Sequence, residues 1–135
     1  IGVLGCANIA KKSVIPAILS ISDFELVAVA SRTAEKAQEF ANLFGCEAVE
    51  GYQKLIDKKD IDIIYMPLPT GLHEEWVLKA LEAGKHILIE KSLAMNYSSA
   101  EKMVQKATEK GLLIMENFSQ PIVFGQRFEC KSCFS

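Results

Sequence analysis

The sequence lacks the features that mark several large classes of protein. No apolar run approaches the ~18 residues that a membrane-spanning helix needs, and no signal-peptide pattern precedes the first apolar segment. The formal net charge is only −2, without the strong basic excess that attracts nucleic acids or membrane surfaces. We therefore expect neither a nucleic acid nor a membrane among the partners of this protein.

Cysteine is scarce too, with 4 residues in the chain of 135. Cys6 and Cys46 stand apart, and only Cys130 and Cys133 form a C-x-x-C pair, close to the C-terminus. A zinc ribbon needs a second such pair, and a thioredoxin-type redox motif lies on a helix after a strand. We predict no metal site, unpaired thiols and a reducing, cytoplasmic setting.

What the sequence does contain is a regular alternation of strand-like apolar runs with helical patterns. The strands are predicted at Ile1–Leu4, Phe24–Ala30, Glu47–Val49, Ile61–Met66, His86–Glu90 and Leu112–Met115. The helices are predicted at Ile9–Ile21, Thr33–Phe44, Tyr52–Lys58, Leu72–Ala83 and Ser98–Lys110, with Thr33 as an N-cap. This order predicts a Rossmann-like, doubly wound α/β domain with about six parallel strands and helices on both faces of the sheet.

The first predicted strand ends in the turn G-C-A-N-I-A, residues 5–10. Small residues stand where dinucleotide-binding turns have G-x-G-x-x-G/A, although Ala7 replaces the middle glycine. The amides that open the following helix suit a pyrophosphate, whereas the added methyl group leaves an ordinary tight connection as the alternative. The predicted phosphate-binding residues are Gly5, Cys6, Ala7, Asn8 and Ile9.

The second predicted strand ends at Ser31-Arg32-Thr33, where NAD-preferring domains carry an acidic residue for the ribose 2′-hydroxyl. Arg32 can pair with a 2′-phosphate and lie flat on adenine, and Lys36 follows one helical turn later. These four residues predict a preference for NADP(H) over NAD(H). The alternative is a helix N-cap followed by a solvated arginine.

Two further strand ends carry candidate residues. Pro67-Leu68-Pro69 forms a stiff loop suited to wall a nicotinamide pocket. His73, at the start of the next helix, is either a polar group of that pocket or a surface or capping histidine. Lys91 follows Glu90 at the end of a strand, where it can bind a substrate oxygen or relay its proton, with Glu90 orienting it. A solvated lysine is the alternative.

Together these segments resemble the N-terminal domain of the Gfo/Idh/MocA oxidoreductases. The matching stretches are G-C-A-N-I-A at 5–10, A-S-R-T at 30–33, P-L-P-T-G-L-H at 67–73, A-L-E-A-G-K-H-I-L-I-E-K at 80–91 and M-E-N-F at 115–118. The resemblance covers about residues 1–118, which we take as the cofactor-binding domain. It implies a parent enzyme that transfers hydride to or from a sugar, sugar nucleotide, polyol or dihydrodiol.

The resemblance also assigns roles to individual residues. Lys91 would be the lysine of the family's E-K-P motif, which contacts the substrate and supports proton transfer; Ser92 replaces the proline here. His73 and the backbone near Leu68 and Pro69 would line the nicotinamide side. Asn117 would lie close to both cofactor and substrate.

Residues 119–135 show none of the family's usual continuation into an α/β substrate domain. We therefore expect an atypical tail from a truncated, frameshifted or spliced reading frame, and a chain that is monomeric or associates through an exposed edge of its core. A stand-alone nucleotide-binding module without turnover is the alternative to the enzyme. A different Rossmann protein, such as a methyltransferase, is disfavoured by Lys91 and by the missing acidic ribose ligand.

Overall fold

Six parallel strands form one sheet in the computed structural model, which describes residues 1–117. The strands are β1 (Gly2–Leu4), β2 (Ala28–Ser31), β3 (Glu47–Glu50), β4 (Ile63–Met66), β5 (His86–Glu90) and β6 (Ile114–Asn117). Their order in the sheet is β3-β2-β1-β4-β5-β6, so the direction of winding reverses between β1 and β4. The predicted Rossmann-like sheet is confirmed. The tail that the sequence sets apart at 119–135, with Cys130 and Cys133, lies outside the described residues.

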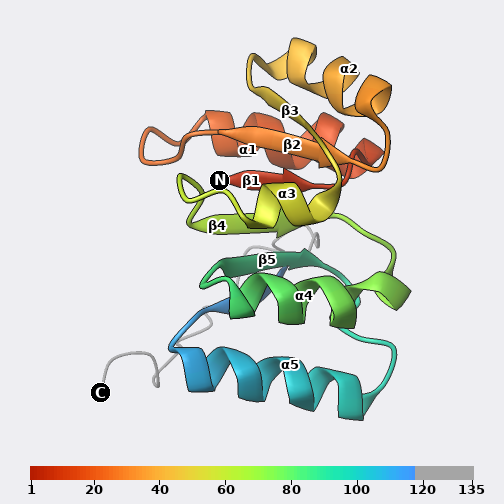
Figure 1. Ribbon diagram of the computed structural model, residues 1–135, viewed down its shortest axis with the longest axis vertical. Coiled ribbons are helices and arrows are strands. Elements are labelled where there is room, and N and C mark those ends of the chain that lie inside the picture. Colours follow the sequence, from red (N-terminus) through yellow and green to blue (C-terminus); the bar gives the residue numbers. More distant parts are fainter. Residues whose placement is uncertain (118–135) are drawn as a thin grey trace, which may run out of the picture.

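Helices cover both faces of the sheet because successive apolar side chains along the strands point to opposite faces. Leu4 and Met66 pack toward α3 (Tyr52–Ile56), α4 (His73–Glu82) and α5 (Tyr97–Lys110), which lie in front of the sheet in Figure 1. Val3 and Tyr65 point to the opposite face, toward α1 (Ile15–Leu19) and α2 (Ala34–Phe44). This period of two places a buried layer on each side of the strands.

The first helix departs from the predicted regular pattern. Helical turns run through residues 8–19, but Ala10–Val14 forms π-helical turns before α1 begins. Pro16 stands in the first turn of α1 and has no N–H to donate to the Lys12 carbonyl. The missing bond accounts for the wider turns that precede the proline.

Three strands start at least two residues later than the sequence predicts. Strand β2 begins at Ala28 rather than Phe24, although the Val27 amide already donates to the Ile1 carbonyl at 2.9 Å. Strand β4 begins at Ile63 rather than Ile61. Strand β6 is displaced to Ile114–Asn117, because the Leu112 amide is used to close α5 by donating to the Ala107 carbonyl. The shift puts Asn117 at the strand end, where it pairs with Glu90.

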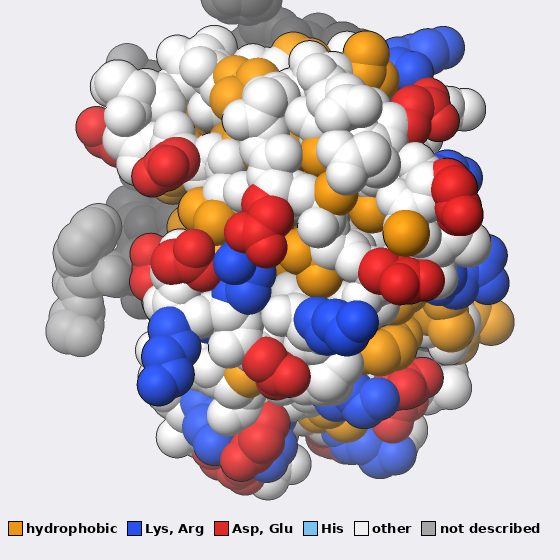
Figure 2. Space-filling view, turned by 45° about the horizontal axis from the view of Figure 1, so that its top comes forward, with side chains coloured by type: hydrophobic (Ala, Val, Ile, Leu, Met, Phe, Trp, Pro, Cys, Tyr) orange, Lys and Arg blue, Asp and Glu red, His pale blue; other side chains and the backbone are white. Residues whose placement is uncertain are grey.

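The surface mixes charges of both signs. Figure 2 shows basic and acidic side chains interspersed over one face of the molecule. Ion pairs join α4 to α5 at Lys102–Glu74, Lys106–Glu82 and Lys110–Glu82. Within residues 1–117, no helix has both the length and the apolar character needed to cross a bilayer.

Gly45 ends α2 in the left-handed conformation, with φ +70°, and its amide donates to the Ala41 carbonyl at 2.8 Å. A β-carbon there would meet nothing within 4 Å, so only the backbone conformation opposes a side chain. We expect Gly45→Ala to lower the free energy of unfolding by about 1 kcal/mol.

Gly71 is the matched control, since its surroundings are equally open and its φ is not positive. We expect Gly71→Ala to change the free energy of unfolding by less than about 0.5 kcal/mol. Urea denaturation of both variants measures the difference. Equal losses would contradict the role assigned to Gly45.

Candidate functional site

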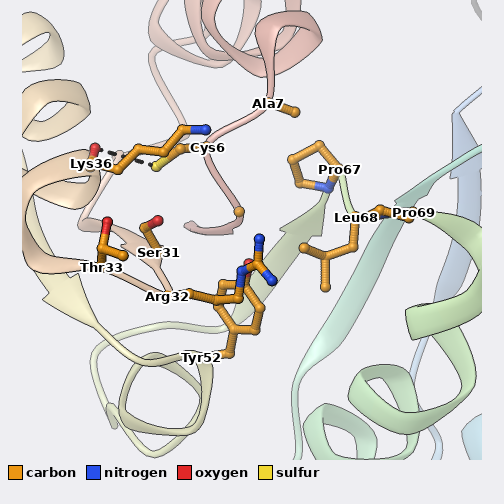
Figure 3. A pocket seen from close by; sticks show the side chains of 11 residues that line it. Cys6, Ala7, Ser31, Arg32, Thr33, Lys36, Tyr52, Pro67, Leu68 and Pro69 are labelled. Carbon is orange, nitrogen blue, oxygen red and sulfur yellow. Dashed lines mark hydrogen bonds between the residues drawn. The ribbon is translucent and has the colours of Figure 1, made fainter.

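A cleft of about 300 Å³ lies at the carboxyl ends of β1, β2 and β4, beside the reversal in strand order. Figure 3 shows its residues converging from separate loops. The residues that line it are Gly5, Cys6, Ala7, Ser31, Arg32, Thr33, Lys36, Tyr52, Pro67, Leu68 and Pro69. Ligands of open α/β sheets bind at this position, because the loops diverge there and leave backbone groups facing a crevice.

The turn after β1 forms one wall of the cleft. Gly5 has φ +121°, and a β-carbon on it would lie 2.8 Å from Cδ2 of Leu68. The glycine therefore serves two needs, the backbone conformation and the close approach of the loop after β4. Helical structure begins at residue 8, and the first amides of a helix have no acceptor within it. Those amides fit a phosphate group, and Asn8 and Ile9 are both exposed there.

The loop after β2 forms the cationic wall. Ser31 is buried, whereas Arg32 and Thr33 are exposed. Thr33 occupies the N-cap position of α2 as predicted, but its side chain makes no capping hydrogen bond. No carboxylate is among the described residues that line the cleft, while Arg32 and Lys36 both are. The wall is thus complementary to a phosphate rather than to a bare ribose diol.

The Cys6 thiol connects the turn after β1 to β2 and α2. Its Sγ lies 3.8 Å from the Ala30 carbonyl oxygen and 3.7 Å from that of Lys36. Burial raises the pKa of the Cys6 thiol to about 11, and the nearby Lys36 charge offsets only part of that effect. The thiol is therefore neutral at physiological pH, so it acts as a weak donor in the turn rather than as a nucleophile.

A second group of polar residues lies at the ends of β4, β5 and β6. The Glu90 carboxylate accepts hydrogen bonds through one oxygen from the Tyr65 hydroxyl at 2.7 Å and from the Asn117 amide at 2.8 Å. The pKa of Tyr65 is raised well above its ordinary value. Burial is the larger cause, and the hydrogen bond to Glu90 is the next. These bonds orient Glu90 toward its neighbours in the sheet, and no ion pair to Lys91 occurs within the described range.

His73 is fully buried, so its interpretation as a surface histidine is wrong. Its Nε2 lies 2.8 Å from the Leu68 carbonyl oxygen, and its Nδ1 lies 2.9 Å from that of Ser92 and 3.1 Å from that of Leu93. Carbonyl oxygens only accept hydrogen bonds, so the ring donates through whichever nitrogen carries its N–H. His73 thereby joins the loop after β4 to the loop after β5 instead of facing the cleft.

Lys91 is exposed at the start of the loop that His73 holds. In the same loop, the Leu93 amide donates to the Glu116 carboxylate at 2.9 Å. The backbone of this loop is therefore anchored while the lysine side chain stays accessible. An accessible ammonium on an anchored loop can approach an oxygen of a bound substrate.

The predicted residues separate into two neighbouring groups. The cleft contains Gly5, Cys6, Ala7, Ser31, Arg32, Thr33, Lys36, Leu68 and Pro69, and the second group contains His73, Glu90, Lys91 and Asn117. Asn8 and Ile9 are exposed at the start of the helix after Ala7 and are not among the residues that line the cleft. Pro67 lines the cleft with Leu68 and Pro69, as the stiff loop predicts, whereas Tyr52 and Tyr65 were not predicted from the sequence. Tyr65 stands among aliphatic residues in a predicted buried strand, and the hydroxyl of a buried tyrosine needs a hydrogen-bond partner. That pattern could have identified Tyr65. No pattern in the sequence distinguishes Tyr52.

Comparisons with known proteins agree with this geometry. The model of an oxidoreductase family with an NAD-binding Rossmann fold matches residues 1–118. A dTDP-3,4-didehydro-2,6-dideoxy-alpha-D-glucose 3-reductase of Saccharopolyspora spinosa is 51% identical over 87% of this chain and 36% of its own length. A D-xylose 1-dehydrogenase (NADP(+)) of Haloferax volcanii is 37% identical over 87% of this chain and 36% of its own length.

Among solved structures, a 3-ketoreductase from Actinomadura kijaniata with NADP aligns at a TM-score of 0.85 and 47% identity. The alignment covers 87% of this chain and 37% of that one. The chain thus spans little more than a third of the length of these relatives.

Removing the His73 imidazole removes its contacts with three backbone carbonyl groups and opens a space in the interior. We expect His73→Ala to lower the free energy of unfolding by about 2–4 kcal/mol. His86→Ala is the control, because His86 is only partly buried and accepts a single hydrogen bond, from the Leu113 amide at 3.0 Å. The control should lose about 1 kcal/mol. Urea denaturation compares the two variants, and similar losses would contradict the joining role of His73.

Proposed function

Because this chain belongs to the oxidoreductase family with an NAD-binding Rossmann fold, we propose that it binds NADP(H) along the carboxyl edge of its sheet. We propose further that residues 1–118 are the cofactor domain of a reductase or dehydrogenase of sugar nucleotides or related sugars, working in the cytoplasm. The unpaired Cys6 and Cys46 thiols suit that reducing compartment.

One observation carries the cofactor assignment. Ser31, Arg32 and Thr33 line the same cleft as the turn at Gly5–Ala7, at the position where an NAD-preferring domain has a carboxylate. A guanidinium forms paired hydrogen bonds to a phosphate that a carboxylate would repel. Arg32 therefore recognises the 2′-phosphate, with Lys36 adding charge, while the amides after Ala7 bind the pyrophosphate.

The substrate class follows from the relatives. The Saccharopolyspora spinosa protein is named a 3-reductase of a dTDP-linked keto sugar, and the Haloferax volcanii protein is named a dehydrogenase of D-xylose. Both names describe exchange between a sugar hydroxyl and a carbonyl. A sugar or sugar nucleotide is accordingly the substrate that we propose for the protein to which this domain belongs.

A bound nicotinamide supplies or accepts the hydride in such a reaction. Lys91 holds the proton: in the reducing direction its Nζ donates a hydrogen bond, and then a proton, to the carbonyl oxygen that becomes a hydroxyl. Glu116 and His73 anchor the loop on which Lys91 stands. Leu68 and Pro69 wall the cleft on the side nearest this loop.

Titration of the chain with NADPH and with NADH tests the proposal. We expect Arg32→Ala to weaken NADPH binding about tenfold or more while NADH binding changes little, since only NADPH carries the 2′-phosphate. Lys59→Ala is the control: it changes the net charge equally, but Lys59 precedes β4 at the opposite edge of the sheet. Fluorescence of the reduced nicotinamide measures both affinities.

Equal losses of NADPH and NADH in Arg32→Ala would contradict the role of the arginine. Failure of the unsubstituted chain to bind either cofactor would contradict the cofactor assignment itself. Binding of NADPH without oxidation by dTDP-linked keto sugars would favour a nucleotide-binding module over a catalytic chain.

A further inference from the structure

Tyr52 lies in the cleft but has no part in the phosphate or proton chemistry proposed above. It is the first residue of α3, and its side chain reaches the space between the loop after β2 and the loop after β4. Figure 3 shows Tyr52 and Arg32 entering this space from different elements, with Leu68 across from them. The ring is partly buried, so one part of it packs against the protein and the rest stays open to the cleft.

The orientation of the Tyr52 ring is set by α4. Trp76 packs against it edge to face, with ring centroids 5.2 Å apart and an interplanar angle of 87°. Lys79 in turn places its Nζ 4.2 Å from the centroid of the Trp76 ring and pairs with Glu75 at 2.7 Å. Tyr52 is thus held in place before any ligand binds. Little side-chain conformational entropy is therefore lost when a ligand packs on its ring.

The lining of the cleft divides into two chemical kinds. Arg32, Lys36 and the turn at Ala7 offer positive charge and free amides, which suit phosphates. Tyr52, Pro67 and Leu68 offer an aromatic ring and aliphatic surface, which suit a flat apolar group. A ligand that fills both parts carries a heteroaromatic base joined to phosphate groups.

We propose that Tyr52 is the aromatic wall of the adenine subsite, with Arg32 beside it as the contact for the 2′-phosphate. This inference rests on the proposed binding of NADP(H). Because adenine is common to NADPH and NADH, Tyr52 contributes affinity for both cofactors without choosing between them. Arg32 determines the preference for NADPH over NADH, so the effects of the two residues on cofactor affinity can be measured separately.

Isothermal calorimetry with NADPH, NADH and pyrophosphate tests the inference; it avoids the emission of Trp76, which itself contacts Tyr52. We expect Tyr52→Ala to weaken NADPH and NADH by the same factor, about tenfold, because one base loses its stacking partner. Pyrophosphate binding should stay unchanged, since it has no base. Tyr52→Phe keeps the ring and should bind both cofactors within about twofold of the unsubstituted chain.

Three results would overturn the inference. Unchanged cofactor affinity in Tyr52→Ala would show that the base does not contact the ring. An equal loss of pyrophosphate binding would show that Tyr52 only maintains the shape of the cleft. A loss in Tyr52→Phe as large as in Tyr52→Ala would assign the effect to the hydroxyl. If instead the unsubstituted chain binds neither NADPH nor NADH, the proposed function fails together with this inference.

Discussion

The close approach of Gly5 and Leu68 is the contact on which the carboxyl edge of the sheet depends. A β-carbon on Gly5 would lie 2.8 Å from Cδ2 of Leu68, so the leucine side chain would have to shift, and the φ of +121° disfavours any side chain there. The Leu68 carbonyl meets His73, whose other ring nitrogen meets Ser92 and Leu93 beside Lys91. One continuous set of contacts thus runs from the proposed phosphate-binding turn to the proposed proton donor. A displacement at either end therefore acts on the other, since packed groups shift together.

The edge combines two environments that suit different steps of one reaction. Around β1 and β2 the cleft presents Arg32 and Lys36 without a facing carboxylate, which favours a ligand of high negative charge. Around β5 and β6 the Glu90 carboxylate is already satisfied by Tyr65 and Asn117. Lys91 therefore remains accessible beside a carboxylate that its neighbours hold in place. Binding and proton transfer are in this way assigned to separate parts of the same edge.

Much of this arrangement follows from local patterns. The alternation of apolar runs predicts the strand order along the chain, and Gly5, Arg32 and Lys91 draw attention because they stand at strand ends. Strand starts were less predictable: β6 begins only after the Leu112 amide has been used to close α5. The π-helical turns before Pro16 follow from the missing N–H of that proline. The spacing of apolar residues in the sequence does not reveal this effect on the preceding residues.

The sequence by itself determined the class of fold, the phosphate-suited turn and the cationic end of β2, because each depends on residues adjacent in the chain. Only the tertiary structure decided that His73 is buried between two loops, that Glu90 is bonded to Tyr65 and Asn117, and that Tyr52 lines the cleft. These residues come from separate elements, and their contacts arise only when crossovers bring distant strand ends together. A side chain's partners across a sheet depend on that packing, which local propensity does not encode.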